Sequence, residues 1–422
     1  MQEPLDEPGS GSSQDLTGSF RYLARQPILD RRSRVHGYEL LYRMGPEQAF
    51  RGDGDLATRS MIDNAVLFGL ERLTGWLPAF VNCTMESLTG QFVHALPPSI
   101  SVLELLEDLQ PTPALIAACR TLKTMGFRLA LDDFVWKPEL GPLVELADYI
   151  KVDFMKLDAA ERRQLLARLE GSTTCLIAEK VETQEDFLQA CAEGFRLFQG
   201  YYFCRPVLLK NRRIPANRLS HIRILEVLQH DPIDFRLLGK LVKQEPSLTY
   251  RLLRLVNSPV CAIRQEVDSI EVALVVVGED AFRRMALLAI TSELNADQPT
   301  EILRMAFVRG RFCELAARLC ALLPAEQFLV GLLSMFPAML RMSMEDLAPT
   351  LPLREEIRQA LLGKVDREQC LLQWLECQER GDWQACDAIA AGNGLNTKQV
   401  MQSYLDAVVW AEAALNTAIL AA

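Results

Sequence analysis

The stretch Phe127-Arg128-Leu129-Ala130-Leu131-Asp132-Asp133 decides the fold expected for this chain, because a short apolar run ends in it on two adjacent carboxylates. A run of this length that is rich in Leu and Phe is typical of a β-strand covered on both faces. A helical pattern over residues 112–125 precedes it. Strands that alternate with helices indicate a parallel sheet with helical crossovers.

Five other runs in the first half of the chain have the same design. Each is apolar and stops on a residue that can bind a metal, a proton or a phosphate: Asn82, Glu104, Lys151 with Asp153, Glu179 and Gln199. Polar groups at the carboxyl ends of parallel strands are where a βα-barrel carries its chemistry. A purely structural reading fails, because each buried, unpaired carboxylate costs several kcal/mol.

Two further extended segments, 22–28 and 34–42, come first in the chain and are separated by the polar cluster 30–33. They bring the expected strands to eight. If these two form a hairpin, one strand runs against the others. We therefore predict an α/β fold, an irregular eight-stranded (β/α)8 barrel, with Glu39 on the same rim as the other polar residues.

The chain changes character near Arg205-Pro206, after which almost only helical periodicity remains. The expected helices include 247–256, 279–294, 301–322 and 397–421. We predict four parts: a disordered tail over 1–19, a barrel domain over 20–206, a linker over 207–216 and an all-helical domain over 217–422.

Composition narrows the class of protein. The 422 residues carry a formal charge of −10, which argues against broad adhesion to nucleic acid or to anionic membranes. Eleven cysteines without a CxxC pair are expected to be reduced thiols, which points to the cytoplasm. No apolar run reaches the roughly 18 residues that span a bilayer, so we expect no membrane segment.

The polar residues at the strand ends suggest a hard metal and phosphate chemistry. Oxygen donors suit Mg²⁺ or Mn²⁺ better than zinc, and five residues supply them: Glu39, Asn82, Glu104, Asp132 and Asp133. Adjacent carboxylates can serve two metals about 4 Å apart, an arrangement that activates water for attack on a phosphodiester. Lys151 is a candidate for holding a phosphate or the water, and Glu179 is a candidate general base.

These residues resemble the EAL domain in order and approximate spacing. The matching motifs are Gln26-Pro27-Ile28, Glu39-Leu40-Leu41-Tyr42-Arg43, Asn82, Glu104-Leu105-Leu106-Glu107, Asp132-Asp133-Phe134, Lys151-Val152-Asp153, Glu179-Lys180-Val181-Glu182 and Gln199-Gly200-Tyr201. The resemblance covers about residues 20–206. It implies a modified TIM barrel with one antiparallel strand, and hydrolysis of cyclic di-GMP to the linear dinucleotide.

The resemblance also assigns roles to residues of this sequence. It implies that one metal is bound by Glu39, Asn82, Glu104 and Asp132, and that Asp132 and Asp133 serve the second. Lys151 and Glu179 match the positions that handle the catalytic water. The positions that contact the substrate are matched by Gln26, Arg43, Asp153 and Gln199.

Departures from the family pattern lie on the side of the second metal. The loop 135–140 reads Val-Trp-Lys-Pro-Glu-Leu, where the family has a Gly-Thr-Gly run followed by serines. Glu107 matches the residue that anchors this loop, which in the family also forms the dimer interface, so the resemblance implies a homodimer. Leu106 replaces a threonine, and Lys180 replaces a glycine.

The helical half resembles the HDOD domain, a relative of the HD-type phosphohydrolases, through segments such as 245–258 and 269–273. HD hydrolases need histidine and aspartate ligands, but no histidine follows His230, and Ser334-Met335 stands where their His-Asp pair would be. We therefore expect this half to bind a protein partner and not to be an enzyme.

Two hypotheses of different classes remain open. In the first, the protein is a metal-dependent cyclic di-GMP phosphodiesterase, which the intact ligand set favours. In the second, it is a catalytically weak or inactive receptor that binds the dinucleotide and signals through the HDOD half, which the altered loop favours. A scaffold that binds no nucleotide would leave the polar strand ends unexplained.

Overall fold

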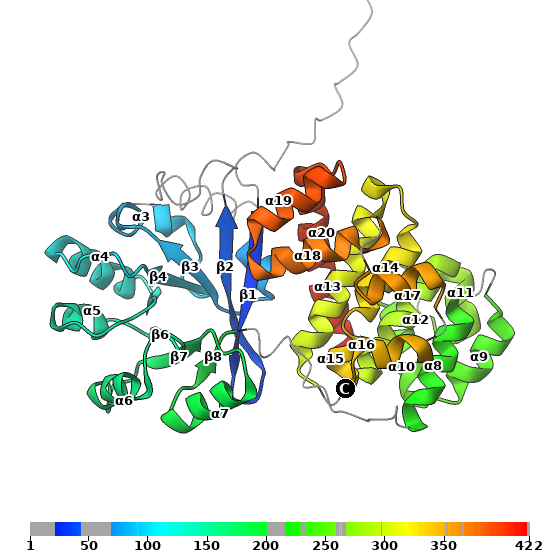
Figure 1. Cartoon of the computed structure of the whole chain (residues 1–422), viewed down its shortest axis with the longest axis horizontal. Coiled ribbons are helices and arrows are strands. Elements are labelled where there is room, and N and C mark those ends of the chain that lie inside the picture. Colours follow the sequence, from blue (N-terminus) through cyan, green and yellow to red (C-terminus); the bar gives the residue numbers. More distant parts are fainter. Residues whose placement is uncertain are drawn as a thin grey trace, which may run out of the picture.

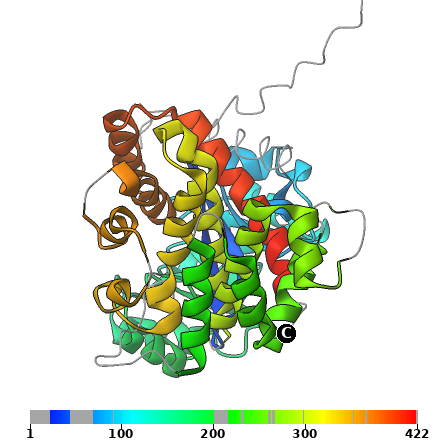
Figure 2. The same ribbon diagram turned by 90° about the vertical axis from the view of Figure 1, so that its right-hand side faces the viewer.

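The computed structural model describes residues 22–43, 69–90, 92–200, 216–229, 233–258, 261, 263, 267–296, 298–351, 353–364 and 367–419. Figure 1 shows a barrel with its outer helices beside a larger group of helices that contains the C-terminal part of the chain. The view in Figure 2, turned by 90°, shows the long helices of this group in front of the barrel.

Eight strands form a closed barrel in the order β1 to β8. They are β1 (Tyr22–Asp30), β2 (Val35–Arg43), β3 (Ala79–Cys83), β4 (Ser101–Leu105), β5 (Arg128–Leu131), β6 (Tyr149–Asp153), β7 (Cys175–Glu179) and β8 (Leu197–Phe198). β1 is antiparallel to both of its neighbours, β2 and β8, and the remaining neighbours pair in parallel. The predicted barrel with one antiparallel strand is confirmed.

Short helices surround the barrel: α2 (Leu70–Thr74), α3 (Met85–Thr89), η1 (Phe92–Ala95), α4 (Pro113–Thr124), η2 (Pro138–Leu140), α5 (Gly141–Val144), α6 (Ala159–Arg168) and α7 (Gln184–Glu193). Side chains fix where several of them begin. Thr112 accepts a hydrogen bond from the Leu115 amide at the start of α4, and α6 and α7 begin with capping boxes at Asp158 and Thr183. These caps fix where the chain turns from β4, β6 and β7 into the helices that follow them.

The C-terminal half is helical, as predicted. Its elements are α8 (Ala216–Gln229), α9 (Phe235–Lys243), α10 (Pro246–Val256), α11 (Ile270–Val277), α12 (Glu279–Leu294), α13 (Thr300–Ala316), η5 (Ala317–Cys320), α14 (Pro324–Leu333), α15 (Phe336–Leu340), α16 (Met344–Leu347), η6 (Ala348–Thr350), α17 (Glu355–Leu361), η7 (Arg367–Gln369), α18 (Cys370–Arg380), α19 (Trp383–Gly392) and α20 (Thr397–Ile419). The helix expected over 301–322 is shorter, because the chain tightens into η5 and then turns at Ala321, whose φ is 50°.

Among the described helices, none is by itself long and apolar enough to cross a membrane. One pair, Pro324–Leu340 with Met344–Thr350, meets the length and composition criteria together, and it is bent by 106°.

The two halves share one apolar core. Tyr22 and Leu23 of β1 and Leu73 of α2 belong to the same buried cluster as the helical half. Because β1 and β2 are joined by a short turn, that connection supplies no helix to cover their outer face. Tyr22 stacks on Trp383 of α19 with ring centroids 5.3 Å apart, and Gln378 of α18 donates to the Leu23 carbonyl at 2.5 Å. Helices of the C-terminal half thus cover this side of the barrel.

The predicted domain boundaries fall in part outside the described residues. The tail 1–19 and positions 207–215 of the predicted linker are not described, and Ala216 is the first residue of α8.

Candidate active site

The interior of the barrel is built in two layers along the strands. The apolar layer consists of Ile28, Phe80, Val102, Ala130, Tyr149, Ile177 and Leu197, which form one buried cluster. Side chains two residues apart on a strand point to the same face. A step of two residues from these positions leads to Gln26, Asn82, Glu104, Asp132, Lys151, Glu179 and Gln199. The strand period alone therefore gathers the predicted site residues into a polar layer at one end of the barrel.

Lys151 lies at the centre of this polar layer. Its ammonium nitrogen Nζ lies between 2.8 and 3.1 Å from four carboxylates that come from β2, β4, β7 and the end of β5: Glu39 at 3.1 Å, Glu104 at 2.9 Å, Asp132 at 2.8 Å and Glu179 at 2.9 Å. The Lys151 side chain is 1% exposed. A buried ammonium is retained in such a place because charged partners compensate its desolvation.

One ammonium cannot neutralise four carboxylates, and the pKa values reflect the imbalance. Burial raises the pKa of Glu104 well above its usual range, raises that of Asp132, and raises that of Glu179 to about 7. Burial also opposes ionisation of Glu39, but the Lys151 charge and a hydrogen bond from Gln199 outweigh it and lower the Glu39 pKa. The cluster therefore holds more negative charge than Lys151 compensates, and it favours a further cation or protons.

Amide side chains complete the layer. Gln199 Nε2 donates to Glu39 Oε2 at 2.7 Å and lies 3.0 Å from Gln26 Oε1, so it bridges these two residues. Asn82 Nδ2 lies 3.4 Å from Glu39 Oε1. Asn82 and Gln199 thus approach the same carboxylate, and Gln199 links it to Gln26.

The donor set fits a hard divalent cation. Asn82 Oδ1, Gln199 Oε1 and Glu104 Oε2 are buried and accept no hydrogen bond from any described residue, while Glu104 Oε1 is paired with the Lys151 ammonium. Carboxylate and amide oxygens of this kind are the ligands that Mg²⁺ and Mn²⁺ prefer. No three His, Cys, Asp or Glu side chains in the described part of the chain have the geometry of a preformed metal site. Lys151 Nζ lies between the carboxylates, so a cation bound here would take over part of its ion pairs.

On the side predicted for a second metal, two lysines pair with carboxylates. Lys180 Nζ lies 2.5 Å from Asp153 Oδ2, and Lys156 Nζ lies 3.7 Å from Asp133 Oδ2. Asp133 and Lys180 both have positive φ angles, 40° and 56°, which are uncommon for residues other than glycine. Two carboxylates predicted to bind metal or substrate are therefore engaged by lysines. Sequence reasoning missed these pairs, although Lys180 in place of a glycine was a visible signal.

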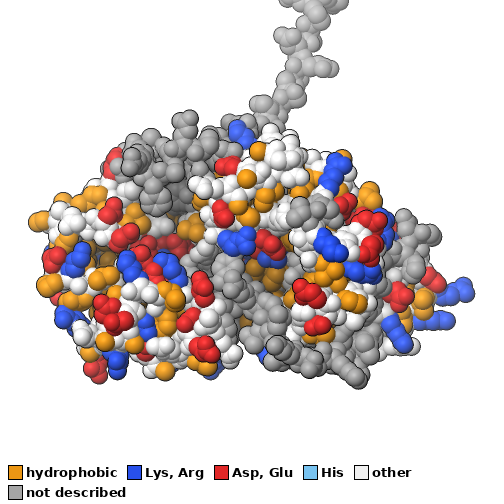
Figure 3. Space-filling view, in the orientation of Figure 1, with side chains coloured by type: hydrophobic (Ala, Val, Ile, Leu, Met, Phe, Trp, Pro, Cys, Tyr) orange, Lys and Arg blue, Asp and Glu red, His pale blue; other side chains and the backbone are white. Residues whose placement is uncertain are grey.

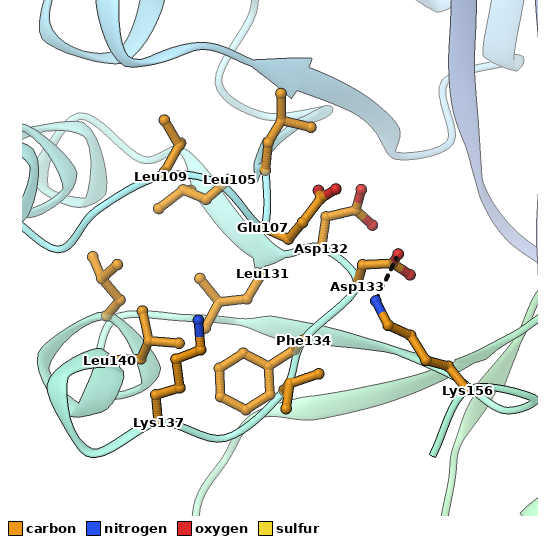
Figure 4. Close-up of a pocket in the computed structure, with 13 residues that line it drawn as sticks. Leu105, Glu107, Leu109, Leu131, Asp132, Asp133, Phe134, Lys137, Leu140 and Lys156 are labelled. Atoms are coloured by element: carbon orange, nitrogen blue, oxygen red, sulfur yellow. Dashed lines mark ion pairs between the residues drawn. The ribbon is translucent and has the colours of Figure 1, made fainter.

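The altered loop borders a cavity of about 270 Å³ next to Asp132 and Asp133. In Figure 4 the carboxylates of Glu107, Asp132 and Asp133 lie on one side of it, while Phe134 and Leu140 line the other. Among the described residues, no hydrogen bond or ion pair joins Glu107 to the loop 135–140. The anchoring role of Glu107 therefore stays a prediction.

The Arg43 side chain lies outside the described part of the structure, so its predicted substrate contact stays a prediction. On the face shown in Figure 3, acidic side chains gather beside basic ones over the barrel half.

In the helical half, Ser334 stands where an HD hydrolase would carry its His-Asp pair, and its side chain takes part in the packing of helices. Arg309 of α13 donates to the Ser334 hydroxyl at 3.1 Å, and its guanidinium pairs with Glu379 of α18 at 2.6 Å. Ser334 in turn donates to the Gly331 carbonyl at 2.7 Å. These contacts join three helices and contain none of the imidazole ligands that HD-type chemistry needs.

Comparison with known proteins gives matches to both halves. The model of the HDOD domain matches residues 214–374. The uncharacterized protein YuxH of Bacillus subtilis is 33% identical over 400 residues, which are 92% of this chain and 97% of that protein. The cyclic di-GMP phosphodiesterase CdgJ of Vibrio cholerae is 32% identical over 398 residues, 93% of this chain and 92% of that protein.

Among solved structures, BlrP1 of Klebsiella pneumoniae in a complex with calcium and cyclic di-GMP is 24% identical. The match covers 44% of this chain and 55% of that chain, with a TM-score of 0.37. The EAL domain of FimX from Pseudomonas aeruginosa, bound to cyclic di-GMP, is 22% identical, and the match covers 45% and 92% of the two chains with a TM-score of 0.36.

Proposed function

The chain belongs to the family of proteins in which an EAL-type barrel is followed by an HDOD domain, and from this membership we propose that it is a cyclic di-GMP signalling protein whose barrel hydrolyses the dinucleotide. The relative CdgJ carries the name of a cyclic di-GMP phosphodiesterase. The observation that supports hydrolysis is the buried cluster of Lys151 with four carboxylates at the strand ends.

A divalent cation, Mg²⁺ or Mn²⁺, would be held by Glu39, Asn82, Glu104 and Asp132, with Asp133 beside them. When bound, such an ion neutralises charge on the phosphate and makes water a better nucleophile. The cluster would attract this cation because its carboxylates carry more negative charge than Lys151 compensates.

The chain's own residues supply the remaining functions. Glu179 accepts a proton from the attacking water, since its raised pKa of about 7 matches a general base that works near neutral pH. Attack of the water oxygen on phosphorus breaks one phosphate ester bond and so opens the ring to the linear dinucleotide. The released sugar oxygen takes up a proton. Lys151 holds the carboxylates and the water in place, while Gln26, Asp153 and Gln199 contact the dinucleotide together with Arg43.

A second candidate function is a receptor that binds cyclic di-GMP without turnover. The lysine pairs on Asp153 and Asp133 favour it, because they engage carboxylates on the side of the predicted second metal. In both functions the HDOD half is a binding domain for a protein partner. We also propose that the protein works in the cytoplasm and as a homodimer.

The test is a calorimetric titration of the purified chain with cyclic di-GMP, with and without Mn²⁺ or Mg²⁺, followed by chromatography of the nucleotide. Metal-dependent linear product supports the phosphodiesterase. Tight binding with intact ligand supports the receptor. The absence of both binding and product would contradict both proposals.

Replacing Lys180 by glycine tests whether its ion pair with Asp153 restrains turnover. The glycine relieves the positive φ, and the lost pair is about half exposed on the lysine side (57%), so we expect a change in stability within about 1 kcal/mol. If turnover needs a free Asp153, Lys180→Gly raises the rate of linear product formation. The control Lys137→Gly removes a lysine that lines the cavity beside Asp133, and it is expected to leave the rate unchanged. A lower rate in Lys180→Gly would show that the lysine assists the reaction.

A further inference from the structure

The strand pair β1–β2 has two faces: a site face, which carries Gln26 and Glu39, and a docking face, which carries Arg25 and Tyr38 and packs against the C-terminal helices. Gln26 and Glu39 point into the barrel, where Gln199 bridges them. Their chain neighbours Arg25 and Tyr38 point to the opposite face, because successive side chains on a strand alternate. One peptide unit therefore separates each of these two site residues from a side chain on the docking face.

Arg25 and Tyr38 are tied to helices α13 and α20 through buried polar groups. The Tyr38 hydroxyl donates to Glu301 Oε2 at 2.9 Å, and Arg25 Nη1 donates to Glu412 Oε1 at 3.0 Å. Arg304 joins the two acids, since it pairs with Glu301 at 2.6 Å and with Glu412 at 2.9 Å. We call these five residues the docking network.

The docking network is balanced in charge and closely packed. Two guanidinium groups face two carboxylates, and Arg25 also donates to the Leu73 carbonyl at 2.6 Å. The Arg25 guanidinium carbon lies 4.7 Å from the centre of the Tyr38 ring. Burial raises the pKa of Tyr38 well above its usual value, so the hydroxyl keeps its proton and remains a donor. Buried networks of this kind favour one geometry over alternatives.

We propose that Arg25 and Tyr38 are positioning residues, through which α13 and α20 of the HDOD half hold the strands that carry Gln26 and Glu39. This inference rests on the proposed function of the barrel site. It makes the HDOD half a structural part of that site. A partner that displaces α13 or α20 would then change cation and dinucleotide binding in the barrel.

Thermodynamic linkage gives the inference a second, reciprocal consequence. If docking of the helices favours the binding geometry of Glu39, then binding at the site must favour docking by the same factor. Addition of Mn²⁺ and cyclic di-GMP is therefore expected to slow hydrogen exchange of α13 and α20 in the full chain.

The experiment compares Tyr38→Phe and Arg25→Met with the wild type and with a control, Glu293→Gln. Glu293 pairs with Arg251 between α10 and α12, in the part of the helical half that lies away from the barrel strands in Figure 1. Mn²⁺ affinity is measured by calorimetry on variants whose circular dichroism matches that of the wild type. We expect the dissociation constant to rise about tenfold in both docking variants, as for other residues that orient metal ligands, and to stay unchanged in the control.

Hydrogen exchange of the peptide over residues 22–43 gives a readout that needs no ligand. We expect exchange to be on the order of ten times faster in Tyr38→Phe and Arg25→Met than in the wild type and the control. If the wild type binds neither Mn²⁺ nor cyclic di-GMP, the proposed function fails, and this exchange measurement alone decides whether the helices hold the strands. Unchanged Mn²⁺ affinity, or unchanged exchange in both docking variants, overturns the inference.

Discussion

Replacement of Glu39 by glutamine is expected to abolish metal-dependent turnover of cyclic di-GMP, with a loss of about 100-fold or more, since even residues that merely orient metal ligands change affinity by 10–100-fold. The Glu39 carboxylate lies within reach of donors from Lys151, Gln199 and Asn82. A glutamine keeps the size but loses the charge, and its amide nitrogen faces other donors. The variant therefore loses a cation ligand and disturbs the bridge to Gln26.

The turnover of Glu39→Gln is measured as linear product formed per protein at saturating Mn²⁺, beside calorimetry of Mn²⁺ binding. Glu145→Gln is the matched control, because Glu145 is exposed on the outside of the barrel, after α5. Turnover in Glu39→Gln equal to that of the control would mean that this carboxylate is not a cation ligand.

Breaking the docking network at Glu412 is expected to have the largest effect on stability. Glu412 pairs with both Arg25 and Arg304, and its side chain is 10% exposed. Removing one partner of a buried ion pair costs about 3–5 kcal/mol, because the remaining charge is left uncompensated. Glu412→Gln is therefore expected to lower the urea midpoint of unfolding. Unfolding is monitored by tryptophan fluorescence, to which Trp374 and Trp383 next to Tyr22 contribute.

The pH dependence of this effect has a definite sign. Although burial opposes its ionisation, the charges of Arg25 and Arg304 lower the pKa of Glu412 below its usual 4.5 in the folded chain. A carboxylate of this kind stabilises the fold above its unfolded pKa, and the contribution is lost as the pH falls through the folded value. The difference in stability between wild type and Glu412→Gln should therefore shrink below about pH 4.5.

Glu355→Gln is the control for this measurement, since Glu355 pairs with Arg358 on an exposed surface. Such pairs contribute little to stability. A urea midpoint of Glu412→Gln that equals that of Glu355→Gln at pH 7 would contradict the structural role of the network.

The barrel and its polar layer were predictable because they follow from local pattern. Each apolar run ends on a polar residue, and the strand period of two places Asn82, Glu104 and Asp132 on the inner face of neighbouring strands. The antiparallel β1 followed from the turn-like cluster at 30–33. None of these inferences needs information about distant parts of the chain.

The docking network was not predictable, because it joins residues far apart in sequence. Tyr38 and Glu301 are 263 positions apart, and Arg25 and Glu412 are 387 apart. No periodicity relates them, and Arg25 and Tyr38 lie in strands whose inner face carried the recognised motifs. The central place of Lys151 among four carboxylates likewise depends on barrel closure. Lys180 is a visible departure from the family pattern, but its pairing with Asp153 depends on the local backbone geometry.

The most direct test of the central claim is a single-turnover experiment with the full chain in excess over cyclic di-GMP in the presence of Mn²⁺. These conditions reveal even a slow enzyme, because every nucleotide is bound. We predict conversion of the bound cyclic di-GMP to the linear dinucleotide, and none in Glu39→Gln. Recovery of intact cyclic di-GMP after complete binding would contradict hydrolysis and leave the receptor function.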